Sequence, residues 1–172
     1  MSGPAPCALI ARTATGADGR WLRGLWRREW GGLVMIAGGR ALALADLEAL
    51  VAVRGRRRVG AATYLVEGER AELVSLNALA AGRGVGSALL AATAERARAA
   101  GARRLEVFTT NDNVAALAFY QRRGLRLVEV RLGAVDAARE LKPTVPLVGE
   151  GGVPVHDEWR LVLPLEPPPA PG

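Results

Sequence analysis

The stretch "AAGRGVGSALLAA" at residues 80–92 places three glycines within five positions and then becomes strongly helix-forming. Such loops commonly bind phosphate, because backbone N–H groups at the helix N-terminus point at the anion. A Walker-type loop is excluded, because it requires a lysine and this stretch has none. The spacing of Gly82, Gly84 and Gly86 also argues against a dinucleotide-binding loop. Alone, the stretch is equally compatible with a glycine cluster that only starts a helix.

The pattern of elements around this loop predicts the fold class. Apolar spacing and turn residues indicate helices at 19–30 (with Asp18 as cap), 85–100, 114–123 and 135–142, and strands at 8–14, 33–38, 47–53, 59–69, 70–79, 103–110, 125–132 and 158–165. A slip in the apolar phase between Leu127 and Val128 predicts either a bulge or burial on both faces of the strand. The order indicates an α+β (mixed α/β) domain with a central mixed, mostly antiparallel sheet flanked by helices. Residues 72–76 and 105–109 should run parallel, because a strand–helix–strand unit forms a right-handed crossover.

Length and composition indicate one globular domain, since half of the 172 residues are apolar. We expect a flexible leader at 1–7, the domain at 8–165, and a disordered Pro-rich tail at 166–172. No apolar run approaches the length of about 18 residues that spans a bilayer, so no membrane partner is expected. The N-terminus has no basic start and no long apolar stretch, which argues against an export signal.

The cysteine and charge content narrows the kinds of site and partner that the protein is expected to have. Cys7 is the only cysteine, which excludes an internal disulfide and a cysteine-cluster metal site and fits a cytoplasmic location. The net charge of +6 comes almost entirely from arginines spread along the chain. This spread favours a compositional bias over a nucleic-acid surface, although a positive protein still attracts an anionic cofactor.

A second motif, "NVAALAFYQRRGL" at 113–125, follows the glycine loop. Together the two motifs resemble those of the GNAT-superfamily N-acetyltransferases, Gln/Arg-x-x-Gly-x-Gly/Ala and Asn-x-x-Ala-x-x-x-Tyr-x-x-x-Gly-Phe. The matching positions are Gly84, Gly86, Asn113, Ala116, Tyr120 and Gly124, whereas Ala81 replaces the usual Gln or Arg and Leu125 replaces the Phe. The resemblance covers about residues 8–165 and implies a GNAT fold, in which the parallel strand pair splays apart.

The resemblance implies direct transfer of the acetyl group of acetyl-CoA to a primary amine of an unidentified small molecule or protein, without a metal. The cofactor-binding residues that it implies are Val74, Ser75, Leu76, Gly82, Arg83, Gly84, Val85, Gly86, Ser87, Asn113 and Tyr120. The Leu76 N–H is the expected donor to the developing oxyanion, and Tyr120 occupies the general-acid position. The alternatives are that Tyr120 only packs in the core and that Asn113 only caps its helix.

The general base is less defined. Glu106 resembles the carboxylate that ribosomal-protein N-terminal acetyltransferases use, Glu72 is its rival, and a water chain without a dedicated base is a third option. Burial between splayed strands would raise the pKa of Glu106 toward the working range.

The acceptor site is expected from the first helix with its following loop and from the segment before the last strand. Three tryptophans form either an aromatic wall there or part of the core: Trp26, Trp30 and Trp159. The acidic pair Asp157 and Glu158 would suit a cationic amine, and His156 is expected at the surface. The competing function is a non-catalytic acyl-CoA-binding module that acts as a sensor, and a homodimer is an open option.

Overall fold

The computed structural model describes residues 8–80 and 82–165. The expected leader and tail, and Ala81 of the glycine loop, lie outside the described residues. The strands of the described part are β1 (Leu9–Thr13), β2 (Val34–Ala37), β3 (Arg40–Ala43), β4 (Glu48–Arg54), β5 (Arg57–Glu67), β6 (Arg70–Ala78), β7 (Arg104–Thr110), β8 (Arg126–Arg131) and β9 (Glu158–Pro164). Its helices are α1 (Gly19–Trp30), α2 (Val85–Ala99), α3 (Val114–Gln121) and α4 (Ala134–Leu141), with 3-10 turns η1 (Gly16–Asp18), η2 (Leu44–Asp46) and η3 (Glu150–Gly152).

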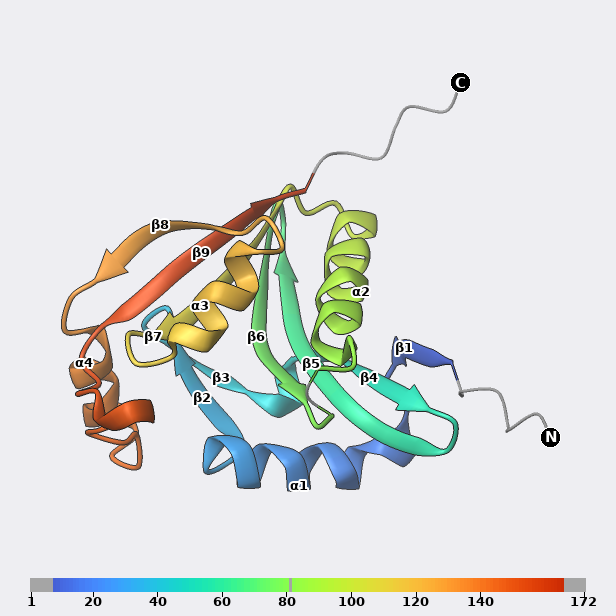
Figure 1. The fold of residues 1–172 in the computed structure, drawn as a ribbon, viewed down its shortest axis with the longest axis horizontal. Helices are drawn as coiled ribbons and strands as arrows, with labels where there is room; N and C mark the ends of the chain where they lie inside the picture. Colours follow the sequence, from blue (N-terminus) through green and yellow to red (C-terminus); the bar gives the residue numbers. More distant parts are fainter. Residues whose placement is uncertain (1–7, 81, 166–172) are drawn as a thin grey trace.

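The described strands form a mixed sheet in the order β1-β4-β5-β6-β7-β9-β8, and β2 and β3 form a separate ribbon (Figure 1). β6 and β7 are parallel, whereas the other neighbours in the sheet are antiparallel. This arrangement confirms the expected fold class and the parallel pair. The β8–β9 register shifts between Leu127 and Glu129, which confirms the bulge, one of the two options that the sequence predicts.

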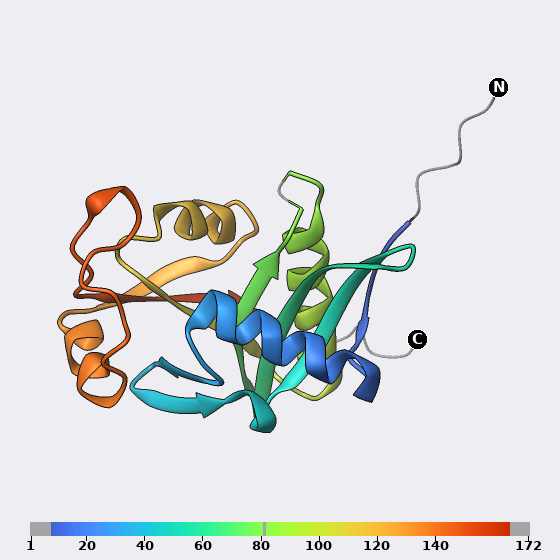
Figure 2. The same cartoon turned by 90° about the horizontal axis from the view of Figure 1, so that it is seen from below.

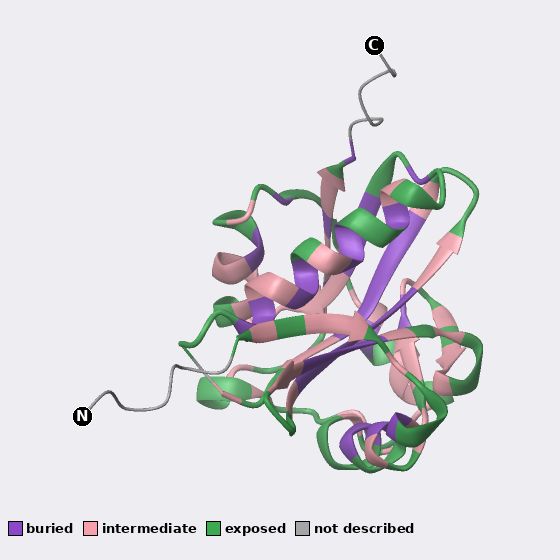
Figure 3. Ribbon diagram, turned by 90° about the vertical axis from the view of Figure 1, so that its right-hand side faces the viewer, coloured by how far each residue is buried: buried purple, intermediate pink, exposed green. Residues whose placement is uncertain are grey.

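Helices cover both faces of the sheet. α2 and α3 pack on one face, where Leu89 and Tyr120 join a core with Leu50, Leu105 and Leu161 from the strands. On the other face, α1 contributes Leu22 and Leu25 to a smaller core with residues 51 and 61. Figure 2 shows α1 crossing the sheet beside the β2–β3 ribbon, and Figure 3 shows the buried residues concentrated along the central strands. The sheet therefore separates two environments, and any opening through it connects them.

Two local predictions were wrong or incomplete. Asp18 precedes α1 but does not cap it, because its buried carboxylate accepts hydrogen bonds from Arg12 at 2.7 Å and Arg58 at 2.8 Å. The sequence also gave no sign of β3, which pairs with β2 through a turn at Gly38 and Gly39. Both glycines have positive φ, +58° and +76°, which two-residue hairpin turns favour.

Candidate active site

The parallel strands β6 and β7 separate partway along their length. Their ladder pairs Arg70–Leu73 with Arg104–Val107 and then ends, although β6 continues to Ala78. The β5–β6 register skips Val74, and a bulge of this kind bends its strand. In Figure 1 the two strands start together at the top and diverge toward the bottom, with α3 in front of the opening. The splay that the family resemblance implies is therefore confirmed.

A cavity of about 500 Å³ occupies this opening. It is lined on one side by Val74, Ser75 and Leu76 of β6 and by Asn113 and Tyr120 of α3. The end of α1, β2, the start of β9 and the segment 142–149 complete its walls. The cavity thus brings together the β6 and α3 residues that the sequence predicts, and it reaches both faces of the sheet.

The glycine loop forms the start of α2. Gly82 and Gly84 have φ values of +68° and +74°, and a Cβ on either would meet nothing within 4 Å. Glycine is therefore required here for its left-handed backbone and not for space. The N–H groups of residues 83–87 belong to the loop and the first turn of α2, a position at which backbone N–H groups can bind an anion, and their contact with the diphosphate stays a prediction.

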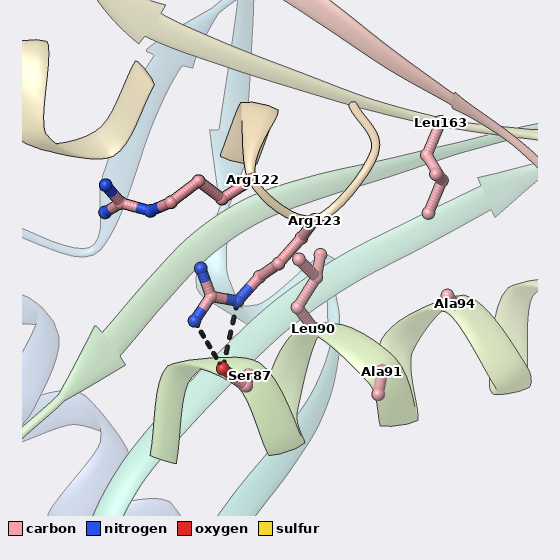
Figure 4. Close-up of a pocket in the computed structure, with 7 residues that line it drawn as sticks. All are labelled: Ser87, Leu90, Ala91, Ala94, Arg122, Arg123 and Leu163. Atoms are coloured by element: carbon pink, nitrogen blue, oxygen red, sulfur yellow. Dashed lines mark hydrogen bonds between the residues drawn. The ribbon is translucent and has the colours of Figure 1, made fainter. Parts of the chain in front are cut away.

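Gly86 has a different role from the other two glycines. A Cβ at this position would lie 3.1 Å from the ring of Phe119, so the missing side chain allows α2 and α3 to approach closely. Arg123 stacks on the same ring at 3.6 Å and donates to Ser87 Oγ, with its Nε at 2.9 Å. Figure 4 shows Arg123 reaching from the end of α3 to Ser87, whereas Arg122 points elsewhere. Sequence reasoning missed Arg123, because nothing in the motif marks a contact across 36 residues.

Tyr120 and Asn113 both line the cavity. Tyr120 is 7% exposed, its ring meets Phe119 edge to face, and its hydroxyl has no hydrogen-bond partner among the described residues. Burial raises the pKa of Tyr120, which keeps the hydroxyl protonated at neutral pH. Asn113 accepts a hydrogen bond from the Ala116 N–H at 3.0 Å and also lines the cavity, so both interpretations of this residue fit.

Glu72 and Glu106 do not line the cavity. They face each other across the paired part of β6 and β7, where Arg70 donates to both carboxylates, at 2.5 Å and 2.8 Å. Burial raises the pKa of Glu106, but hydrogen bonds from Arg70 and Arg104 outweigh it and hold this pKa below the ordinary value. The expectation of a raised pKa between splayed strands is therefore wrong. Glu72 also accepts from Arg40 at 2.7 Å, so both carboxylates are ion-paired within the sheet and away from the cavity.

Glu158 is the buried carboxylate that lines the cavity. It is 8% exposed, and its two oxygens accept from the Gly38 N–H at 3.1 Å and from Arg131 at 2.7 Å. Burial raises the pKa of Glu158 despite these two donors. Its neighbour Asp157 instead accepts from the Gly133 N–H, so only one member of the acidic pair faces the cavity.

The other residues that the sequence suggested for the acceptor site lie in the core, in the cavity and at the surface. Trp26 is buried in the core, Trp159 packs against the core on the α2 face, and Trp30 lines the cavity. His156 is exposed and contacts Asp136 at 2.9 Å, which confirms a surface position.

Asn111 positions the segment that precedes β9, a role that the sequence analysis did not identify. Its Oδ1 accepts from the N–H groups of His156 and Asp157 at 3.0 Å, and its Nδ2 donates to the carbonyl of Pro154 at 2.9 Å. These bonds fix the segment that leads into β9 and so the place of Glu158. The only available signal was the polar run 111–113 at the end of a strand.

Two searches over the described part of the chain bear on other kinds of site. None of its helices combines the length and apolar character that crossing a membrane requires. No group of three or more His, Cys, Asp and Glu side chains there is arranged to hold a metal ion.

Comparisons with known proteins agree with the geometry. The model of the Acetyltransferase (GNAT) family matches residues 20–125. The uncharacterized protein YdhI of Bacillus subtilis (strain 168) is 36% identical over 138 residues, which are 80% of this chain and 86% of YdhI. The uncharacterized protein YxbD of the same organism is 41% identical over 108 residues, or 63% of this chain and 68% of YxbD.

A solved structure shares the fold. A Bacillus subtilis acetyltransferase in complex with CoA has a TM-score of 0.70 to this chain at 19% identity, over 92% of this chain and 100% of the other. The resemblance drawn from the two motifs is thereby confirmed at the level of family and fold. Because the family model matches more than half of the chain and YdhI most of it, the chain belongs to the GNAT family of acetyltransferases.

Proposed function

We propose that this protein transfers the acetyl group of acetyl-CoA to a primary amine by direct attack of the amine nitrogen. The observation that carries the proposal is the opening between β6 and β7, where the ladder ends at Leu73 and Val107 and the cavity contains Tyr120. The CoA in the similar Bacillus subtilis acetyltransferase supports the choice of cosubstrate. The acetyl thioester is the chemistry that acetyl-CoA supplies when bound; positioning and proton transfer fall to the residues of this chain.

The backbone supplies most of the proposed cosubstrate contacts. The N–H groups of residues 83–87 receive the diphosphate, and each such charge-assisted bond is worth about 1.5–3 kcal/mol. Beyond Leu73, the edge of β6 that faced β7 has no strand partner, so Val74, Ser75 and Leu76 can pair with the amides of the pantetheine arm. The Leu76 N–H is the proposed donor to the negative charge that develops on the thioester oxygen.

Proton transfer completes the reaction. The sulfur leaves as a thiolate and takes a proton from Tyr120, which lines the cavity and is protonated at neutral pH. A free thiol has a pKa of about 8.5, below the value of about 10 for an ordinary tyrosine, and burial raises the pKa of Tyr120 further. The proton is therefore shared with sulfur in the transition state and is not released beforehand.

A two-part experiment tests the proposal. Acetyl-CoA should raise the Tm of the protein, because it binds the folded loop only, whereas ATP serves as the control for phosphate attracted by the arginine-rich surface. Release of the CoA thiol is then followed over a panel of primary amines, with the acetylated product identified by mass. Failure to bind acetyl-CoA would overturn the proposal. Binding without thiol release for any amine would favour the non-catalytic sensor.

A further inference from the structure

Glu158 occupies the side of the sheet that faces α1 and the β2–β3 ribbon. The β7–β9 register pairs it with Thr110, which lies on the same face as Phe108 and Glu106 and opposite to Leu105 and Val107 in the α2–α3 core. Tyr120 belongs to that opposite core, yet both Tyr120 and Glu158 line the one cavity. The opening therefore has the Tyr120 phenol on one side of the sheet and the Glu158 carboxylate on the other.

We propose that Glu158 binds the ammonium group of the acceptor and removes its proton, and that the acceptor is a monocationic primary amine with an apolar body. This inference rests on the proposed acetyl transfer and names the group and substrate class which that function lacks.

The charged groups of the cavity favour Glu158 over its alternatives. Glu29 is paired with Arg28 near the rim, with its side chain 35% exposed. Asp112 is only half-buried, whereas Glu158 is buried, and the contacts of Asp112 with Thr110 and the Glu150 N–H hold the loop. A carboxylate has about four lone-pair sites, and the two oxygens of Glu158 use only one each.

The walls around Glu158 determine what the amine carries. Many of the lining residues from β2, from β7 and from the segments before β9 are apolar: Met35, Ile36, Phe108, Val145, Pro146 and Val155. The cation in the cavity, Lys142, donates to the carbonyls of Trp30 and Val34 at 2.6 Å and 2.8 Å, so it is not free to bind an acidic substrate. Glu158 already pairs with Arg131 at 2.7 Å, so among these apolar side chains it can hold at most one further positive charge, whereas a polyamine would bury more charge there.

The protons and bonds balance as follows. One N–H bond of the ammonium breaks, and its proton moves to Glu158 and later to solvent. The freed lone pair forms the bond to the acetyl carbon, the C–S bond breaks, and its electron pair leaves with sulfur. Sulfur takes the proton of Tyr120, and the second proton that the nitrogen loses restores the tyrosine.

The surroundings of Glu158 set its pH response. Arg131 from β8 and the Gly38 N–H from the β2–β3 turn lower the pKa of Glu158, whereas burial and the negative charge of Glu72 on β6 raise it, and the net direction is upward. Glu29, Asp112, Lys142 and Tyr120 are the other ionisable groups among the residues that line the cavity. Since only the ionised carboxylate accepts a proton, turnover should rise as pH passes upward through this raised pKa.

The test compares the parent with Glu158→Gln, using phenethylamine as the probe amine. We expect kcat/KM to fall by about 100-fold at neutral pH and to recover partly at high pH, where the probe supplies its own neutral form. Acetyl-CoA affinity should stay unchanged. Glu129→Gln is the matched control, because Glu129 is an exposed carboxylate on the neighbouring strand that pairs with Arg160 and lies outside the cavity.

A second variant keeps the carboxylate and alters its donor. In Gly38→Ala the new Cβ would lie 3.0 Å from the Phe108 ring at a φ of +58°, so the turn and its N–H must shift. Loss of that donor raises the pKa of Glu158, and the midpoint of the pH–rate profile should move upward.

Three results would overturn the inference. The first is an unchanged pH profile in Glu158→Gln. The second is turnover of spermidine with a higher kcat/KM than phenethylamine. The third is a parent that acetylates a peptide N-terminus but not phenethylamine. A parent that binds acetyl-CoA and acetylates no amine at all would instead overturn the proposed function, and the inference with it.

Discussion

The left-handed glycine at the start of α2 offers a sharp test of the phosphate loop. Gly84 has a φ of +74°, and a Cβ there would meet nothing within 4 Å, so Gly84→Ala introduces backbone strain without a steric clash. A non-glycine residue in this conformation costs about 1–2 kcal/mol. The loop is exposed, so the free protein can relieve the strain by changing the loop's shape. Acetyl-CoA binding must then restore that shape, which should weaken its affinity by about 5- to 30-fold.

Gly68→Ala is the matched control for this variant. Gly68 has a φ of +60°, also with open space around a new Cβ, but it lies in the tight β5–β6 hairpin between paired Glu67 and Arg70. That turn cannot relax without breaking the pairing at the adjoining ends of β5 and β6. The same strain should therefore lower Tm by about 2–8 °C and leave the affinity for acetyl-CoA unchanged. Isothermal titration calorimetry and thermal melts of both variants make the comparison. Parent-like affinity in a folded Gly84→Ala protein would refute the assignment of this loop to the diphosphate.

Three further predictions concern catalysis, packing and pH. Tyr120→Phe should lower kcat by about 100-fold with little change in acetyl-CoA affinity, and an unchanged rate would return this residue to a packing role. Arg123→Ala removes the bonds to Ser87 and the ring contact, and should cost about 1–3 kcal/mol in urea denaturation, with Arg122→Ala close to the parent. The arginines around Asp18 hold its pKa well below the ordinary value, so it contributes stability above pH 4 or so that is lost as pH falls. Asp18→Asn should lower the free energy of unfolding at neutral pH by about 2 kcal/mol and flatten its acid dependence; an unchanged acid profile would contradict this.

Local patterns predicted most of the fold. Apolar periodicity located α1 and α2, and the phase slip at Leu127 located the β8 bulge, because both signals depend on residues close in sequence. β3 was missed because its four residues are too few to carry a period, and it is defined by pairing with β2. The cap at Asp18 was misjudged because its partner Arg58 lies 40 residues away.

The same distinction applies to the candidate site. The glycine loop and the α3 motif are contiguous, so the resemblance could locate Gly84, Asn113 and Tyr120. A carboxylate's pKa depends on partners from several strands, which the sequence does not display. Glu106 therefore looked available although three arginines contact it. Glu158 was noticed only as a charge suited to an amine, because its burial results from the pairing of β9 with two other strands.

The hydrogen bonds of Lys142 to backbone carbonyls have a consequence for the chemical durability of the protein. Lys142 is the only lysine in the sequence, where the other basic residues are arginines and one histidine. Thioesters slowly acylate exposed lysine amines without any enzyme, and a protein that holds a thioester exposes itself to this damage continuously. Arginine keeps its proton and does not compete as a nucleophile. The single ε-amine is bound to the carbonyls of Trp30 and Val34, so modification there would also release α4 from the end of α1. Prolonged incubation with acetyl-CoA should therefore leave the side chains of this protein almost unmodified, and any adduct on Lys142 should accompany loss of the acceptor cavity.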